Sequence, residues 1–523
     1  MNFMKSAHPL HLAEVLAALS LATDLANDQP FETSLRACLL ATELARAAGA
    51  STETIADVYY AGLLRFVGCT AFSSEWAGAL GGDDNVLHRT FAPIDARRPG
   101  ELLPAAIGLG KGRGLKERVR AVANFVTEGP SILTAFAASN CEAALRFAAR
   151  LDMGAGVIAT LGQIYARWDG RGFPANLAEE SIALPARILQ VARVAEIHAR
   201  VSGLAHAQSV LKTRAGGQLD PHLVKVFASE AELLLAPLEG PSVWDAVLAR
   251  APSTNPSRAG IAEVARAFAD FADLKSVYSV GHSTSVAELA ERAAKLLGLD
   301  ESARANVRHA ALLHDLGSVS VPAGIWEKKG ALTTAEWERV RLHPYYTERV
   351  LARSPLLSEV AILAGAHHER CDGSGYSRGT PAALIPPDAM VIAAADCYCA
   401  FLEARPHRPA LGAAEAVRAM RAEVSQRRFE AEIVEAILEA AGHERQRRRQ
   451  TWPRGLSDRE VDVLRRVARG CSNKEIAEQL SISPRTVQHH VAHIYEKIGV
   501  STRAGATLFA SENDLLGWVN DAP

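Results

Sequence analysis

Apolar residues recur along most of the chain with the spacing of a helix. In residues 286–297, alanine and leucine return every three or four positions, and charged residues occupy the positions between them. Few segments alternate with the period of two that a half-buried strand requires. The pattern therefore predicts an all-α protein.

Two breaks divide this helical pattern. Residues 251–260 are rich in proline, serine and glycine, and residues 443–455 are basic and contain a proline. A chain of 523 residues is too long for one core. We therefore predict three domains, residues 1–250, 258–442 and 454–523, with residues 443–453 as a basic linker before the last one.

Composition narrows the class of protein. Hydrophobic residues make up 48% of the chain and charged residues 22%, which is ordinary for a globular protein. No apolar run reaches 18 residues, the N-terminus lacks the features of a signal peptide, and the seven cysteines show neither pairing nor zinc spacing. These observations predict a cytoplasmic protein that does not enter a membrane.

The chain contains an internal repeat. Residues 168–174 resemble residues 371–377 at an offset of 203, and residues 144–150 resemble 347–353 at the same offset. Residues 61–68 align with 310–317 at an offset of 249, so the first copy holds about 46 extra residues. This insert is placed within Thr70–Ser139, and because it contains the glycine-rich stretch 108–114 we predict that the insert is a flexible basic loop.

Histidine and aspartate gather in the second copy. Adjacent residues on a helix point about 100° apart, so a His-Asp or His-His doublet can serve two metal ions from one turn. Imidazole with carboxylate suits iron or manganese, and two such ions can clamp a phosphate. An aspartate that follows apolar residues, such as Asp396, is costly to bury without a partner. The candidate ligands are His282, His314, Asp315, His343, His367, His368 and Asp396.

The order of these residues, with Asp372-Gly-Ser-Gly-Tyr376 and Arg405-Pro-His-Arg408 among them, resembles the HD-GYP phosphodiesterases over residues 262–425. The resemblance implies an HD-type helical bundle with two iron or manganese ions, and hydrolysis of cyclic di-GMP. It makes all seven residues metal ligands and assigns Asp315 to catalysis as well. It also implies that Tyr376, Arg405 and Arg408 hold the dinucleotide, as expected of side chains that stack on a base or pair with phosphate.

Three positions depart from the family pattern. The usual lysine after the His-Asp doublet is Ser318, the proline of the GYP motif is Ser377, and a glutamate found in three-metal members is Tyr278. Two ions are therefore expected. The intact ligand set favours a metal-dependent phosphohydrolase, whereas Ser318 and Ser377 favour a domain that senses a nucleotide without hydrolysing it.

The first copy lacks the candidate ligands. Through the two offsets, the seven positions correspond to Thr33, Arg65, Phe66, Asn140, Ile164, Tyr165 and Arg193. Two arginines at these places would repel a metal ion. We interpret the first copy as a degenerate HD-type domain, either a ligand-sensing module or a packing partner for the second copy.

The last domain has the signals of three short helices. Ser457 with Glu460, and Ser472 with Glu475, form capping boxes, and Ser483 precedes Pro484 at the start of a third helix. Residues 454–518 resemble the LuxR-type helix-turn-helix, which implies binding to DNA. The predicted groove contacts are Arg485, Gln488, His489 and His493, and the predicted phosphate contacts are Lys474, Thr486 and Lys497.

Together these features predict a one-component bacterial transcriptional regulator: two HD-type helical bundles followed by a small LuxR-type domain. Its expected partners are DNA, a cyclic dinucleotide or another phosphoester, and a second copy of itself, because LuxR-type domains usually bind DNA as dimers. The arginines of the linker could add non-specific attraction to DNA or serve only as a solvated tether.

Overall fold

A computed structural model of the protein describes residues 9–80, 83–109, 114–253, 259–444, 452–513 and 515. All regular elements in these ranges are helices, so the all-α prediction is confirmed. The chain divides into two compact units, Met1–Glu444 and Arg445–Pro523. The larger unit holds both copies of the repeat, and the smaller holds the C-terminal domain.

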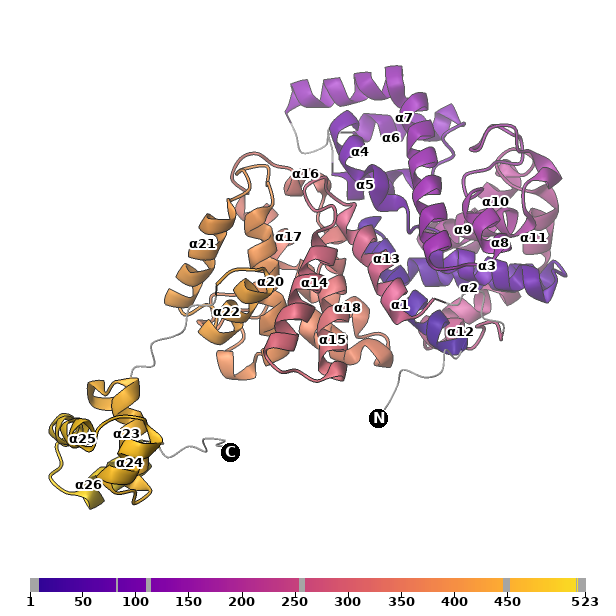
Figure 1. The fold of residues 1–523 in the computed structure, drawn as a ribbon. Helices are drawn as coiled ribbons and strands as arrows, with labels where there is room; N and C mark the ends of the chain where they lie inside the picture. The colour runs from indigo at the N-terminus through magenta and orange to yellow at the C-terminus, as the bar shows by residue number, and fades with distance from the viewer. Residues whose placement is uncertain are drawn as a thin grey trace. The chain divides into compact units, whose positions relative to one another are not determined.

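Figure 1 shows the ribbon of each unit. The first copy contains α1 Pro9–Ala26, α2 Thr33–Ala47, α3 Thr52–Leu64, η1 Cys69–Phe72, α4 Ser73–Leu80, α5 Asp84–Phe91, α6 Pro99–Gly108, α7 Leu115–Arg150, α8 Ala155–Leu161, η2 Glu179–Ser181, α9 Leu184–Ser202, α10 Leu204–Arg214, α11 Pro221–Leu235, η3 Ala236–Glu239 and α12 Val243–Leu248. The second copy contains α13 Ile261–Asp273, α14 His282–Leu296, α15 Glu301–Leu313, η4 Leu316–Ser320, α16 Ala323–Trp326, α17 Thr334–Arg341, α18 His343–Leu351, η5 Pro355–Leu357, α19 Ser358–Gly365, η6 Ala382–Leu384, α20 Pro387–Leu402, α21 Ala413–Ser425 and α22 Ala431–Ala440.

The predicted repeat is confirmed by matching contacts. A Cβ atom added to Gly68 would lie 2.1 Å from the carbonyl oxygen of Asn140, and one added to Gly317 would lie 2.2 Å from that of His343. These two glycines differ by 249 in number and the two contacted residues by 203, so one close approach satisfies both offsets. Glycine is required there because any side chain would strike a backbone carbonyl.

The first helix of each copy contacts both copies: α1 packs on α2 and α3 of its own copy, and α13 packs on α14 and α15 of its own. Helix α1 packs against η4 and α18 of the second copy, and α13 packs against η1 and α7 of the first. The Thr70 hydroxyl of η1 donates a hydrogen bond to the carbonyl of Phe271 in α13 at 2.8 Å. One continuous apolar core includes buried residues of both copies. The predicted boundary at residues 251–258 stays a prediction, and residues 254–258 lie outside the described part of the chain.

The insert of the first copy is helical, so the prediction of a flexible basic loop is wrong for its described part. Helices α4, α5 and α6 and the first half of α7 build it, around a separate apolar cluster that includes Trp76, Leu87 and Phe125. The glycines misled the prediction, because they occupy one short connection and not the whole insert. Residues 110–113 of that connection lie outside the described residues.

The smaller unit contains η7 Pro453–Gly455, α23 Asp458–Ala468, α24 Asn473–Gln479, α25 Pro484–Ile498 and α26 Arg503–Glu512 around its own apolar core. The predicted caps are confirmed: Ser457, Ser472 and Ser483 each accept a hydrogen bond from the backbone N–H of the third residue of their helix. Residues 445–451, the greater part of the predicted basic linker, lie outside the described residues.

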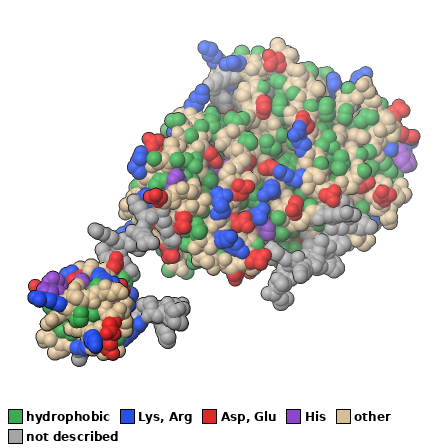
Figure 2. Space-filling model, in the orientation of Figure 1, with side chains coloured by type: hydrophobic (Ala, Val, Ile, Leu, Met, Phe, Trp, Pro, Cys, Tyr) green, Lys and Arg blue, Asp and Glu red, His purple; other side chains and the backbone are tan. Residues whose placement is uncertain are grey.

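Figure 2 shows acidic and basic side chains scattered among apolar ones over the face of the larger unit in view. No single helix in the described ranges is long and apolar enough to cross a membrane. The bent pair Thr52–Leu64 and Cys69–Ala79 meets the length and composition of a span.

Candidate metal centre and nucleic-acid interface

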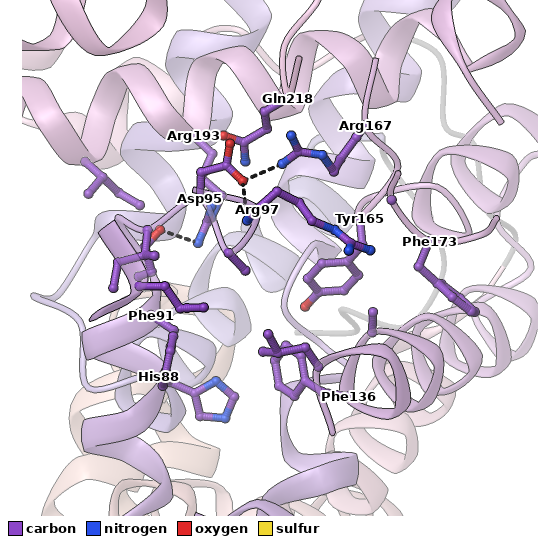
Figure 3. Close-up of a pocket in the computed structure, with 18 of the residues that line it drawn as sticks. His88, Phe91, Asp95, Arg97, Phe136, Tyr165, Arg167, Phe173, Arg193 and Gln218 are labelled. Carbon is purple, nitrogen blue, oxygen red and sulfur yellow. Dashed lines mark hydrogen bonds and ion pairs between the residues drawn. The ribbon is translucent and has the colours of Figure 1, made fainter. Parts of the chain in front are cut away.

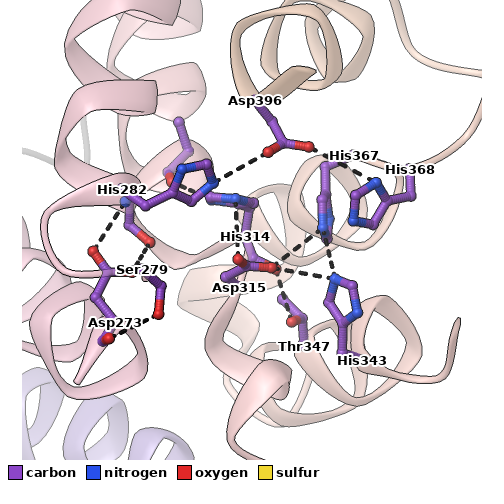
Figure 4. Close-up of polar contacts among 12 residues, drawn as sticks. Asp273, Ser279, His282, His314, Asp315, His343, Thr347, His367, His368 and Asp396 are labelled. Atoms are coloured by element: carbon purple, nitrogen blue, oxygen red, sulfur yellow. Dashed lines mark hydrogen bonds and ion pairs between the residues drawn. The ribbon is translucent and has the colours of Figure 1, made fainter. Parts of the chain in front are cut away.

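The seven candidate ligands converge in the second copy, mostly from helix ends (Figure 4). His282 is the first residue of α14 and His343 the first of α18. His314 and Asp315 join α15 to η4, His367 and His368 follow α19, and Asp396 lies within α20. Four of these five segments lie at a helix end or just beyond one. Helices that run in different directions can therefore bring their side chains to one place.

The ligand atoms form two groups. His343, His367 and His368 make one, and His282, His314 and Asp315 make the other, and within each group the atoms lie within 4.8 Å of one another. The Nε2 atoms of His343 and His367 are only 3.0 Å apart. Such closeness suits two imidazoles that share one cation.

Backbone carbonyls fix the orientation of three of the rings. His314, His343 and His367 each place Nδ1 within hydrogen-bond distance, 2.6 to 2.7 Å, of the carbonyl three residues earlier. An Nδ1–H donated there leaves the Nε2 lone pair of each ring for a metal ion. The local helical geometry therefore selects the tautomer that a ligand needs.

Two carboxylates connect the two groups. Asp315 has one oxygen 3.2 Å from His343 and 3.5 Å from His367, and its other oxygen 3.7 Å from His314. Asp396 has one oxygen 3.1 Å from His282 and the other 3.8 Å from His368. Carboxylates placed between two groups of imidazoles would help to hold a pair of divalent cations.

The chemistry of these residues fits two divalent cations. His314 is fully buried and its Nε2 has no hydrogen-bond partner among the described residues. Burial lowers the pKa of His314 to about 4, so its ring is neutral and able to coordinate. Burial alone would raise the pKa of Asp315, but the surrounding imidazoles hold it well below its usual range. Imidazoles and carboxylates without thiolates suit iron or manganese.

Glu403 belongs to this site and was not predicted. Its carboxylate lies 2.8 Å from Nδ1 of His282, and the Nε2 atom of the same ring faces Asp396 at 3.1 Å. Glu403 therefore orients His282. The signal was available, because Glu403 follows Asp396 by seven residues, which is two helical turns on one face.

Tyr376 lies beside the histidines of the candidate metal centre, and its predicted role in substrate binding stays a prediction. Its ring centroid is 4.5 Å from that of His368 and 6.2 Å from that of His343. Two residues of α17 that sequence reasoning missed stand beside it: the Trp337 ring at 6.0 Å and the Arg341 guanidinium at 5.9 Å. Trp337 is 44% exposed, which is unusual for so large an apolar side chain.

The two predicted phosphate-binding arginines lie in the loop after α20. Arg405 is paired with Glu403 at 2.8 Å. The Arg408 guanidinium donates to the backbone carbonyls of Ala400, Phe401, Glu403 and Pro409. Arg408 thus holds this loop together, and the predicted role of both residues in substrate binding stays a prediction. Ser318, in place of the usual lysine, is buried in η4.

In the smaller unit, α24 and α25 carry the residues predicted to bind DNA. Lys474, Arg485, Thr486, Gln488, His489, His493 and Lys497 are all exposed. His489 and His493 lie one turn apart on α25, with ring centroids 6.3 Å apart, so they share a face. Lys497 is less available than expected, because its ammonium is paired with Glu460 at 2.6 Å and donates to the carbonyl of Gly455.

Comparison with known proteins identifies both units. The family model "HD domain" matches residues 139–223 and 266–433, and the model "Bacterial regulatory proteins, luxR family" matches residues 454–510. The first match reaches both copies of the repeat. The chain therefore carries an HD domain and a C-terminal LuxR-type DNA-binding domain.

The relatives are phosphodiesterases. The chain is 27% identical to the 3′3′-cGAMP-specific phosphodiesterase 3 of Vibrio cholerae over 405 residues, 76% of this chain and 88% of the relative. It is 36% identical to a cyclic di-GMP phosphodiesterase of Thermotoga maritima over 159 residues, 30% of this chain and 43% of that protein. A crystal structure of a cyclic GMP-AMP specific phosphodiesterase of V. cholerae (V-cGAP3) superposes with a TM-score of 0.57 at 25% identity, covering 82% of this chain and 97% of that one.

Proposed function

We propose that this protein is a DNA-binding regulator whose second copy holds two divalent metal ions and hydrolyses a cyclic dinucleotide. The position of Asp315 carries the proposal: its two oxygens face the two groups of histidines, so its carboxylate would help to hold ions at both groups. Cyclic di-GMP is the substrate expected from sequence. The relative matched over most of its length is cGAMP-specific, so 3′3′-cGAMP is the first substrate to test.

The residues around the centre suit a dinucleotide. Ions held there would act as Lewis acids on a phosphate and on an attacking water. Tyr376 and the exposed Trp337 offer two aromatic faces on which bases can stack, and Arg341 adds a cation beside them. Glu403 would keep His282 directed at the centre through its 2.8 Å contact with Nδ1.

The test is hydrolysis by the full chain. Protein loaded with Mn²⁺ or Fe²⁺ is incubated with 3′3′-cGAMP or cyclic di-GMP, and the linear products are separated by chromatography. We expect turnover that is lost in the His314→Ala variant, because the buried Nε2 is removed. Turnover of both substrates no greater than that of the variant would contradict the proposal.

A second function is favoured by one group of observations. Ser318 brings no charge to the site, and Arg408 is held by backbone carbonyls, so two cations expected to neutralise phosphate are absent or engaged. We propose as the alternative a domain that binds the dinucleotide without hydrolysing it. Dinucleotide binding that requires His314, with no product formed, would select this alternative.

In either case the LuxR-type domain supplies the output. We propose that α25 enters a major groove of DNA with Gln488 and His489 reading bases, and that the protein acts as a homodimer in the cytoplasm. Gel shifts test the first point: Gln488→Ala and His489→Ala should weaken specific binding more than non-specific binding. Unchanged affinity of both variants would refute the groove assignment.

A further inference from the structure

The first copy has lost its ligands but keeps a cavity where they would lie. A pocket of about 600 Å³ is lined by Thr33, Arg65, Phe66, Tyr165 and Arg193. These residues occupy five of the seven positions that carry metal ligands in the second copy. The volume is within the range of small-molecule sites, about 300–1,000 Å³.

The insert builds the other walls of this cavity. Trp76 of α4, His88 and Phe91 of α5, and Phe125 and Phe136 of α7 line it. Figure 3 shows the rings of His88, Phe91 and Phe136 on one side of the pocket, with Asp95, Arg97, Arg167 and Arg193 gathered on the other. The pocket therefore has one aromatic side and one charged side.

On the charged side of the pocket, basic side chains outnumber acidic ones. Five arginines line the cavity, namely Arg65, Arg97, Arg167, Arg171 and Arg193, against three carboxylates, Asp24, Asp95 and Glu196. Asp95 is paired with Arg167, and Glu196 with Arg36 and Arg200. No carboxylate of the described residues lies within ion-pair distance of Arg65 or Arg193. Their charges are therefore free to meet an anion.

Of these residues, Arg65 gives the strongest indication of an anion site. It is 5% exposed, and its Nη1 has no hydrogen-bond partner among the described residues. Its Nη2 makes only two long contacts, at 3.4 Å, with the carbonyl of Ile164 and with Gln190. Burial and then the charge of Arg193 lower the pKa of Arg65 to about 9. A buried cation in this condition is costly, and an anion would relieve it.

We propose that the cavity of the first copy is a nucleotide-binding site. Arg65 stands where the second copy has His314 and Arg193 where it has Asp396, so guanidinium groups supply the positive charge that metal ions would bring. Guanidinium pairs with phosphate through two hydrogen bonds, and the aromatic side can stack on a base. Because none of these positions carries a histidine or a carboxylate, the site is expected to bind a nucleotide without hydrolysing it.

Helix α5 connects this cavity to the metal centre of the second copy. His88 and Phe91 line the cavity, while one turn earlier Asn85 donates to the carbonyls of Val319 and Ser320 in η4, at 3.1 and 3.0 Å. Asp84 forms a fully buried ion pair with Lys275 at 2.5 Å and accepts from the backbone N–H of Ala323 at 2.8 Å. A nucleotide that shifts α5 would thus act on the segment that follows His314 and Asp315.

Binding is tested in the full chain with the metal centre disabled by His367→Ala and His368→Ala, so that second-copy activity plays no part. GMP, 3′3′-cGAMP and cyclic di-GMP are titrated by calorimetry, with inorganic phosphate as the ring-free comparison. We expect at least one nucleotide to bind more tightly than phosphate. Arg65→Met and Arg193→Met should each weaken its binding by about tenfold or more, the loss of a charge-assisted hydrogen bond.

Two further variants keep the test independent of folding. Arg97→Ala removes an exposed arginine of the same cavity and should also weaken binding, whereas Arg146→Ala, 80% exposed on α7 and outside the cavity, should not. Binding by none of the three nucleotides would overturn the proposal. So would an unchanged Kd in those cavity variants, Arg97→Ala included, that keep the wild-type circular dichroism spectrum.

Hydrogen exchange gives a second measurement on the same protein. The bound nucleotide should slow amide exchange in α5 and η4, and Asn85→Ala should abolish the effect in η4 while keeping it in the cavity walls. Protection confined to the second copy would place the nucleotide elsewhere and overturn the assignment.

Discussion

At the scale of single residues, Asp315 is where the two groups of histidines meet. Asp315→Ala should lower the metal content of the protein from about two ions per chain toward none, because the site loses the carboxylate that faces both groups of histidines. His368→Ala, which removes a ligand from one group only, should leave about one ion. Elemental analysis of the purified variants measures this.

The exposed His222 of α11 offers a control, because His222→Ala removes a histidine far from the centre without touching it. Equal metal loss in Asp315→Ala and His368→Ala would argue against a bridging role for Asp315.

The buried carboxyl group of Asp24 predicts how the stability of the protein depends on pH. Burial raises its pKa to about 8, although Ser34 donates two hydrogen bonds to it. The folded protein therefore holds a proton that the unfolded chain releases near pH 4, so stability falls as pH rises from about 4 to about 8. Asp24→Asn keeps an acceptor for Ser34 and removes this penalty. The variant should unfold at a higher temperature than the wild type at pH 8, and the difference should shrink toward pH 5.

The exposed Asp152→Asn variant controls for the loss of one carboxyl group. A midpoint difference for Asp24→Asn that is the same at both pH values would show that Asp24 does not titrate in this range.

The residues of the metal centre were predictable because doublets of histidine and aspartate in apolar helices have few structural explanations. Trp337 and Arg341 were not predicted, since both lie beside Tyr376, which only the folded chain brings near them, whereas the spacing of Glu403 from Asp396 was a signal that the prediction did not use. For Arg408 the predicted role in substrate binding stays a prediction, and only the folded chain shows that its guanidinium donates to the carbonyls of its own loop.

At the scale of elements, the packing of η4 against α18 sets the distance between Asp315 and His343. The backbone N–H of Gly317 donates to the Thr347 hydroxyl at 2.8 Å, and that hydroxyl donates to the carbonyl of His314 at 2.9 Å. A methyl group at Gly317 would lie 2.2 Å from the His343 carbonyl oxygen and 2.6 Å from the Thr347 nitrogen. Gly317→Ala should therefore separate η4 from α18, with a loss of stability of about 1–3 kcal/mol and weaker metal binding.

Two matched substitutions sharpen this prediction. Gly68→Ala makes the same clash in the first copy, so it should cost similar stability while leaving metal content unchanged. Gly324→Ala, where a Cβ meets nothing within 4 Å, should change neither quantity. Thermal unfolding and elemental analysis of the three variants are the measurements, and full metal occupancy in Gly317→Ala would contradict the argument.

Element boundaries were predictable where a local signal exists. Ser457, Ser472 and Ser483 each accept a hydrogen bond from a backbone N–H three residues later. Local sequence is therefore enough to predict these caps. The helices of the insert were missed because glycines at 108–114 dominated the interpretation, although Trp76, Phe125 and Phe136 supply an apolar cluster that only helices can bring together.

At the scale of the whole molecule, the sequence revealed two copies but not how they pack. Apolar faces on α1 and α13 predict burial without naming the partner. The structure shows that each of these helices packs against both η1 and η4, and so contacts both copies. A degenerate copy that is merely a packing partner would need no cavity. The pocket around Arg65 is the observation that favours ligand sensing over that alternative.

If nucleotide binding in the larger unit controls the LuxR-type domain, thermodynamic linkage fixes what must be seen. A nucleotide that changes the affinity of the full chain for DNA by some factor must have its own affinity changed by DNA by the same factor. Couplings of this kind are typically 5- to 150-fold.

The test uses the chain whose metal centre is disabled by His367→Ala and His368→Ala. The tightest-binding nucleotide is titrated with and without DNA, and DNA is titrated with and without that nucleotide. We expect the two affinities to change by equal factors. At nucleotide concentrations that saturate the parent, Arg65→Met should reduce the change in DNA affinity toward none, because its site is then largely unoccupied, while DNA affinity without nucleotide stays unchanged. If the DNA affinity is the same with and without a nucleotide known to be bound, nucleotide binding in the larger unit is not coupled to DNA binding by the LuxR-type domain.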